Sequence, residues 1–228
     1  MQTTLDQHPN VVCLHELARE KLKPTHFYRH FLGMRKDLCD LRKTDPSAFL
    51  SQIFNARQPR QVGALGFKAL YTQPSHGSGD WRLFWTSLGQ VPGLHVVHLQ
   101  RNRVEGIVSM KLAMETKRWI SGHYEIPPLV LDCEWLLDQL RRLATLEDAA
   151  CRTLSKGPML RVRYLDLVGD PQGVCDGIFE FLGLSSQPVK LAIRKQRSRD
   201  LAETIANWKQ VVARVADSEF AAELDGLH

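Results

Sequence analysis

The sequence lacks the features that mark membrane, secreted and repetitive proteins. It contains no run of about 18 uninterrupted apolar residues, which a membrane-spanning helix needs. The opening residues MQTTLDQHPN have neither the basic segment nor the apolar segment of a secretory signal. Internal repeats and low-complexity linkers are also missing. We therefore expect a soluble, cytoplasmic chain with no integral membrane segment, folded as one domain over residues 1–228.

The spacing of the cysteines offers neither a metal framework nor a disulfide framework. The five cysteines lie at least 18 positions apart, so no C-x-x-C pair is present to hold a metal ion or to form a redox centre. We expect reduced, mostly buried thiols and no metal cofactor. The cysteines are Cys13, Cys39, Cys133, Cys151 and Cys175.

The overall composition is that of an ordinary globular protein, but positive charge is concentrated near the C-terminus of the chain. Hydrophobic residues make up 43% and charged residues 24%, which is enough to build a core. The formal net charge is +5, and the segment Lys190–Arg214 alone holds seven basic and two acidic residues. Such a field suits a phosphate ester, a sulfate ester or a nucleic-acid backbone, and the alternative is a solvated helical face. No helix-turn-helix, zinc-finger or RNP-type motif accompanies it, so we expect no nucleic-acid partner.

Short strands alternate with helices along the chain. Helices are predicted after Asp45-Pro46 and after Asp170-Pro171, where a capping side chain precedes a proline at the first helical position. Apolar residues that recur every three or four positions predict a long amphipathic helix over Cys133–Leu154. This alternation favours an α/β fold, in which a mainly parallel sheet is flanked by helices. The predicted strands are Gln61–Leu70, Leu94–Leu99 and Met159–Val168.

Arg101 and Ser109 form the first candidate site. In parallel sheets ligands bind at the carboxyl ends of the strands, and Arg101 directly leaves the predicted strand Leu94–Leu99. Ser109 follows about two turns into the next helix, whose N-terminus favours negative charge. A guanidinium and a hydroxyl in this position can bind a phosphate group.

Four segments occur in a characteristic order: DQHPNVVCLHEL, QRNRVEGIVS, RVRYLDLVGDPQGVCDGIFEFLGL and IRKQRSRDLAETIANWKQV. Together they resemble the cytosolic-type sulfotransferase superfamily, especially bacterial carbohydrate sulfotransferases of the nodulation-factor and trehalose kind. The resemblance implies a P-loop NTPase-like fold. It also implies transfer of a sulfuryl group from 3′-phosphoadenosine 5′-phosphosulfate (PAPS) to a hydroxyl of a carbohydrate or glycolipid acceptor, without a metal ion.

The resemblance assigns roles to individual residues. Arg101 and Ser109 match the residues that bind the 3′-phosphate of the donor. The basic segment that closes over the same nucleotide corresponds to Arg194, Lys195, Gln196 and Arg197, and the alternative for these four is a surface tail.

Glu16 matches the residue that takes the proton from the acceptor hydroxyl. His15 is the alternative base, since its ordinary pKa is closer to neutral pH. The non-catalytic alternative for Glu16 is an exposed carboxylate at a helix start. Lys68 is a candidate to support the acceptor or the developing charge, with a surface lysine as the alternative. Trp119 and Tyr124 are candidates for an aromatic wall against a sugar, or belong to an ordinary packed loop.

The resemblance is incomplete at the beginning of the chain. The superfamily opens with a strand and a loop of the R-x-G-[ST] kind, whose backbone N–H groups hold the 5′-phosphosulfate. Met1 falls in the helix that follows this loop in the superfamily. The stretch Gly77–Gly79 indicates a turn and not a replacement for the phosphosulfate-binding loop. We interpret the fold as N-terminally truncated, and we expect the chain alone to aggregate and to transfer no sulfuryl group. The alternative function is a non-catalytic nucleotide- or polyanion-binding relative.

Overall fold

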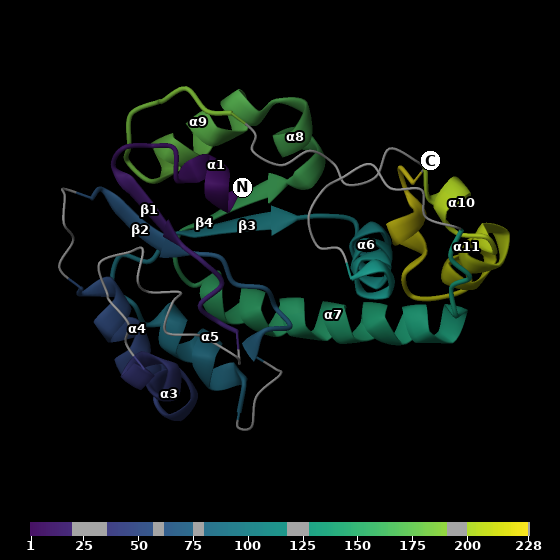
Figure 1. Cartoon of the computed structure of the whole chain (residues 1–228), viewed down its shortest axis with the longest axis horizontal. Coiled ribbons are helices and arrows are strands. Elements are labelled where there is room, and N and C mark those ends of the chain that lie inside the picture. The colour runs from purple at the N-terminus through teal and green to yellow at the C-terminus, as the bar shows by residue number, and fades with distance from the viewer. Residues whose placement is uncertain (20–35, 57–61, 75–79, 118–127, 191–199, 228) are drawn as a thin grey trace. The chain divides into compact units, whose positions relative to one another are not determined.

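The chain forms two compact units that share one long helix. The structure, a computed structural model, describes residues 1–19, 36–56, 62–74, 80–117, 128–190 and 200–227 (Figure 1). Unit 1 comprises Met1–Leu99 and Leu146–Ala192, and unit 2 comprises Gln100–Thr145 and Ile193–His228. Helix α7 (Cys133–Leu154) begins in unit 2 and ends in unit 1. The expected single domain stays a prediction.

Unit 1 is built on two pairs of parallel strands. Strand β1 (Val11–Leu14) pairs with β2 (Ala64–Phe67) in parallel, with Val11 opposite Ala64 and Leu14 opposite Phe67. Strand β3 (Val96–Gln100) pairs with β4 (Met159–Arg163). The N–H of Val96, at the start of β3, donates to the carbonyl of Pro158, just before β4, at 3.0 Å, so this pair is also parallel. The predicted α/β fold with parallel strands flanked by helices is confirmed.

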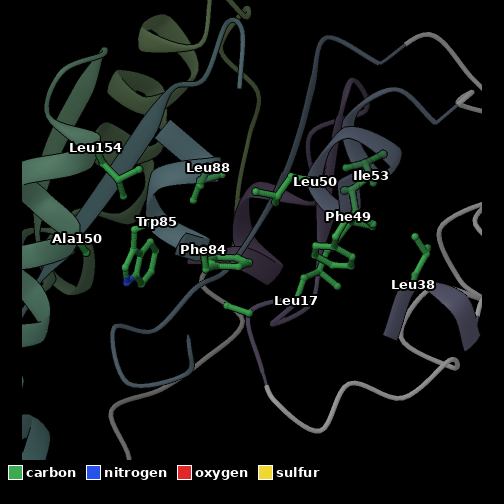
Figure 2. Close-up of a cluster of buried hydrophobic side chains, with 13 residues drawn as sticks. Leu17, Leu38, Phe49, Leu50, Ile53, Phe84, Trp85, Leu88, Ala150 and Leu154 are labelled. Carbon is green, nitrogen blue, oxygen red and sulfur yellow. The ribbon is translucent and has the colours of Figure 1, made fainter. Parts of the chain in front are cut away.

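Each strand sends alternate side chains into two different cores. Val12 and Leu14 of β1 join a cluster with Phe49 and Trp85, part of which Figure 2 shows, whereas Val11 joins a second cluster around Phe179. Each fully buried Phe or Leu contributes about 1.5–3 kcal/mol to folding. Helices α3 (Lys36–Thr44), α4 (Pro46–Phe54) and α5 (Arg82–Gly89) lie on one side of β1 and β2 in Figure 1. Helices α1 (Gln2–Leu5), α8 (Tyr164–Gly169) and α9 (Pro171–Phe181) lie on the other.

The predicted helix starts are confirmed with their caps. The side chain of Asp45 accepts a hydrogen bond from the Ala48 N–H at 2.9 Å, and Asp170 accepts one from the Gly173 N–H at 2.9 Å. Helix α9 ends at Phe181, two residues before Gly183, whose φ of 70° is a left-handed conformation that favours glycine.

Three local predictions are wrong. The expected strand Met159–Val168 ends at Arg163, because Tyr164–Gly169 instead forms α8. Arg163, which precedes this helix, pairs with Asp166 in its first turn at 2.7 Å. Strand β1 was not expected, since a run of four apolar residues is a weak signal. Only Cys175 of the five free cysteines is buried, and the other four are half-buried rather than mostly buried.

Unit 2 is helical. It contains α6 (Arg103–Thr116), α10 (Leu201–Thr204), α11 (Trp208–Ala216), the 3-10 helix η2 (Ala221–Leu224) and most of α7. The core is formed by residues of α6, α7 and α11, with Leu136, Leu137, Leu140 and Val211 each 0% exposed. Among the described residues, no helix of either unit combines the length and the apolar character needed to cross a membrane.

Candidate functional site

Glu16 and Lys68 lie at the same edge of the β1–β2 pair. Glu16 follows β1 by two residues and Lys68 directly follows β2. Because the two strands are parallel and in register, their carboxyl ends meet, and polar residues that leave these ends come together. The ammonium group of Lys68 forms an ion pair with Glu16 Oε1. The structure therefore brings these two predicted residues into contact and corrects the idea that Glu16 stands at a helix start.

The Glu16 carboxylate is held on both oxygens. Gln73 Nε2 donates to Glu16 Oε2 at 2.7 Å, and Arg19 Nε lies 3.6 Å from the same oxygen. The Glu16 side chain is 23% exposed, so solvent still reaches it. Burial alone would raise the pKa of the Glu16 carboxyl, but the hydrogen bond and charge of Lys68, the charge of Arg19 and the Gln73 amide outweigh it and lower the pKa below the ordinary 4.5.

Gln73 is a site residue that the sequence did not reveal. Its side chain is buried, and while Nε2 donates to Glu16, Oε1 accepts from the Leu70 N–H at 3.1 Å. The amide thus ties Glu16 to the turn that follows β2, and both of its polar ends are used. A glutamine 57 positions from its partner gives no local pattern, so only the fold identifies it.

His15, the alternative base, has a different environment. The side chain is exposed, and its Nδ1 lies 3.5 Å from Gln2 Nε2. Glu16, by contrast, is held on both carboxylate oxygens by Lys68 and Gln73, and for an ionised base such contacts fix the orientation. The geometry favours Glu16.

Arg101 and Ser109 lie where the sequence placed them, at the start of unit 2. Arg101 lies between β3 and α6, and Ser109 is half-buried in the second turn of α6. Arg101 Nε is 3.4 Å from Glu105 Oε2, and Glu105 and Ser109 are four residues apart and share one face of the helix. The Arg101 side chain therefore reaches toward the face that carries Ser109.

A carboxylate of the protein itself occupies part of the N-terminus of α6. Glu223 Oε2 accepts from the backbone N–H of Arg103 at 2.8 Å, and its Oε1 accepts from the Arg103 guanidinium at 2.6 Å. Asn102 caps the same helix by accepting from the Glu105 N–H at 3.0 Å. The helix start thus binds an anionic group, as expected, but one of its backbone N–H groups already donates to Glu223.

The remaining predicted residues lie outside the described residues. They are the nucleotide-closing candidates Arg194, Lys195, Gln196 and Arg197, the acceptor candidates Trp119 and Tyr124, and the turn Gly77–Gly79.

One of the comparisons with known proteins, a family profile, identifies the family. The profile of the Sulfotransferase family matches residues 1–188, which include Glu16, Lys68, Arg101 and Ser109. Nodulation protein H of Rhizobium tropici is 27% identical over 153 residues, which cover 62% of this chain and 60% of that protein. A crystal structure of a sulfotransferase from Alicyclobacillus acidocaldarius superimposes with a TM-score of 0.50 at 14% identity, covering 97% of this chain and 85% of that one. At this identity the structural match shows the fold alone.

Proposed function

The chain belongs to the Sulfotransferase family, and from that premise we propose that it transfers a sulfuryl group from PAPS to a hydroxyl of a carbohydrate or glycolipid. The observation that carries the proposal is the Glu16 carboxylate, held by Lys68 and Gln73 at the carboxyl ends of two parallel strands. This is the place where enzymes with parallel sheets bind their ligands.

Glu16 acts as the general base in this proposal. The acceptor oxygen forms a bond to sulfur, the bond between sulfur and the bisphosphate leaving group breaks, and the acceptor proton passes to a Glu16 oxygen. The lowered pKa of Glu16 means that the side chain is ionised at neutral pH, which is the form that can accept a proton. Lys68 supplies positive charge for the oxygens of the transferring group, and Gln73 keeps the carboxylate oriented.

Arg101 and Ser109 bind the 3′-phosphate of the donor. A guanidinium can donate two parallel hydrogen bonds to a phosphate, and Arg101 is 30% exposed, so its donors are accessible. Binding requires Arg101 to exchange its contact with Glu105 for the phosphate. Arg194, Lys195, Gln196 and Arg197 complete the nucleotide site, and Trp119 and Tyr124 contact the acceptor.

The test is to measure donor binding and sulfuryl transfer separately. Calorimetry with adenosine 3′,5′-bisphosphate measures binding, and radiolabelled PAPS with a panel of oligosaccharides and glycolipids measures transfer. In a version of the chain that carries the superfamily's first strand and R-x-G-[ST] loop ahead of Met1, we expect Glu16→Gln to bind the bisphosphate normally and to lower turnover by about two to four orders of magnitude. Glu115→Gln, which removes an exposed carboxylate of α6, is the control and should change neither.

The outcomes separate the alternatives. Bisphosphate binding without transfer to any acceptor would support a nucleotide-binding relative without catalysis. Absence of both binding and transfer would contradict the proposal, and full turnover by Glu16→Gln would remove Glu16 from the mechanism.

A further inference from the structure

A second cluster of reactive side chains lies in unit 1, away from Glu16. It joins His98 on β3 to Glu147 and Cys151 on α7, residues that are up to 53 positions apart in the sequence. Glu147 and Cys151 are four residues apart and so lie on one face of the helix, directed at the same strand. One nitrogen, oxygen or sulfur atom from each residue lies within 4.8 Å of the other two.

The distances within the cluster are short. His98 Nε2 lies 3.3 Å from Glu147 Oε1, and Cys151 Sγ lies 3.8 Å from His98 Nδ1. Two ligands of a tetrahedral zinc ion, at about 2.0–2.3 Å from the metal, are about 3.3–3.6 Å apart. Because the two contacts reach different nitrogens of the ring, one ion bound to a single nitrogen requires the other partner to rotate toward that nitrogen, across the 4.8 Å within which the three ligand atoms lie.

One ring nitrogen of His98 makes no hydrogen bond within this cluster. The side chain is 6% exposed, and its Nε2 is buried without a hydrogen-bond partner, although a Glu147 oxygen lies 3.3 Å away. A buried nitrogen left in this state costs about 1–3 kcal/mol. A metal ion or a proton shared with Glu147 would remove that cost.

We propose that His98, Glu147 and Cys151 form a zinc-binding site. A thiolate and an imidazole are ligands that suit Zn²⁺ and exclude Mg²⁺ and Ca²⁺, and a carboxylate oxygen completes a set of three. Glu147 is 17% exposed and Cys151 is half-buried, so an ion can enter, and water takes the fourth position. As the sulfur–zinc bond forms, the Cys151 thiol loses its proton to solvent.

The site would fasten β3 to α7. The ring of Tyr71 packs against His98 with centroids 5.9 Å apart at 87°, and the Tyr71 hydroxyl hydrogen-bonds to Cys151, so the ligands are oriented from outside. A role of this kind is structural, and it does not depend on the proposed sulfuryl transfer.

Cobalt is the probe that tests the site in the full chain. We expect one equivalent of Co²⁺ to give the near-ultraviolet thiolate-to-cobalt band and the visible bands of a tetrahedral ion, and Zn²⁺ to abolish them. Cys151→Ser should lose the thiolate band, and Glu147→Gln should weaken Co²⁺ binding by at least about tenfold. Cys133→Ser and Asp148→Asn, which remove a thiol and a carboxylate of the same helix outside the cluster, are the controls and should leave both unchanged.

Stability provides a second readout. A saturating concentration of Zn²⁺ should raise the thermal midpoint of the wild-type chain by roughly 5 °C and should not change that of Cys151→Ser. A thiolate band that persists in Cys151→Ser, or no band with stoichiometric Co²⁺, would overturn the proposal.

Discussion

At the scale of the residue, the state of Glu16 is a balance of opposing effects. Burial favours the neutral acid, whereas Lys68, Arg19 and Gln73 favour the carboxylate and together lower its pKa. A carboxylate stabilised in this way is ionised at neutral pH but is a weaker base than an unpaired one. Its partners must therefore exchange contacts with substrate before it can take a proton efficiently.

Replacement of Lys68 should raise the pKa of Glu16. In Lys68→Met the strongest partner that opposes burial is gone, while Arg19 and Gln73 remain, so the pKa of Glu16 should be higher than in the wild-type chain. Carboxyl-carbon NMR titration measures this, and Lys111→Met, which breaks the Lys111–Glu115 pair instead, is the control. An unchanged titration of Glu16 in Lys68→Met would contradict the ion pair.

The lowered pKa of Glu16 also makes the stability of the fold depend on pH, and Lys68→Met should change that dependence. A carboxyl whose folded pKa is lowered stabilises the fold above its unfolded pKa, and this contribution disappears as the pH falls through the folded value. The wild-type chain should therefore lose this contribution below about pH 4.5, and Lys68→Met should have less of it at neutral pH.

Glu105 should oppose donor binding through its contact with Arg101. Glu105→Gln removes the charge that competes for the guanidinium, so affinity for adenosine 3′,5′-bisphosphate should rise about two- to fivefold, the value of a partly exposed ion pair. Arg101→Ala should weaken it by about 1.5–3 kcal/mol. Calorimetric titration measures both, with Glu115→Gln as a control that removes the same charge from the same helix. Equal affinity for wild type and Arg101→Ala would remove Arg101 from the proposed site.

Individual site residues were partly predictable. Arg101 and Ser109 depend on one local pattern, a strand followed by a helix, and the structure contains that strand and helix, whereas their role in donor binding stays a prediction. The pairing of Glu16 with Lys68 and Gln73 depends on how β1 and β2 align, which no local pattern in the sequence contains. The His98–Glu147–Cys151 cluster was missed for the same reason.

At the scale of the element, helices were more predictable than strands. Helix α7 runs over Cys133–Leu154, the range that its periodicity predicts, because an amphipathic pattern extends over many turns. Strands of four or five residues carry too few positions to distinguish them from neighbouring turns. For this reason β1 was not predicted, and Tyr164–Gly169, which was predicted to continue a strand, forms a helix.

The capping side chains should contribute separately to stability. Asp45→Ala and Asp170→Ala each remove the acceptor for a first-turn N–H, so each should lower the free energy of unfolding by about 1 kcal/mol. Because the caps belong to different helices and share no partner, the double variant should lose the sum. Chemical denaturation measures this, and Asp148→Ala in the middle of α7 is the control. A loss below about 0.3 kcal/mol for either cap would show that water replaces it.

At the scale of the whole molecule, α7 couples the two units through its own backbone. Its Leu136, Leu137 and Leu140 belong to the core of unit 2, and its Ala150 and Leu154 belong to a core of unit 1. Unfolding of either unit frees one end of α7, and the other end of the same helix belongs to the core of the other unit. The helical hydrogen bonds between these two groups of residues therefore link the unfolding of one unit to that of the other.

A break in α7 at the boundary should therefore uncouple the units. Thr145 is exposed at the last position of unit 2, so Thr145→Pro removes a helical N–H and introduces a steric clash without disturbing either core, at a cost of about 3 kcal/mol. Hydrogen exchange should show both cores of the wild-type chain opening together, whereas in Thr145→Pro the shorter unit 2 should open at lower free energy than unit 1. Thr145→Ala keeps the helix and should behave as wild type. If the two cores of the wild-type chain already exchange at different free energies, α7 does not couple them.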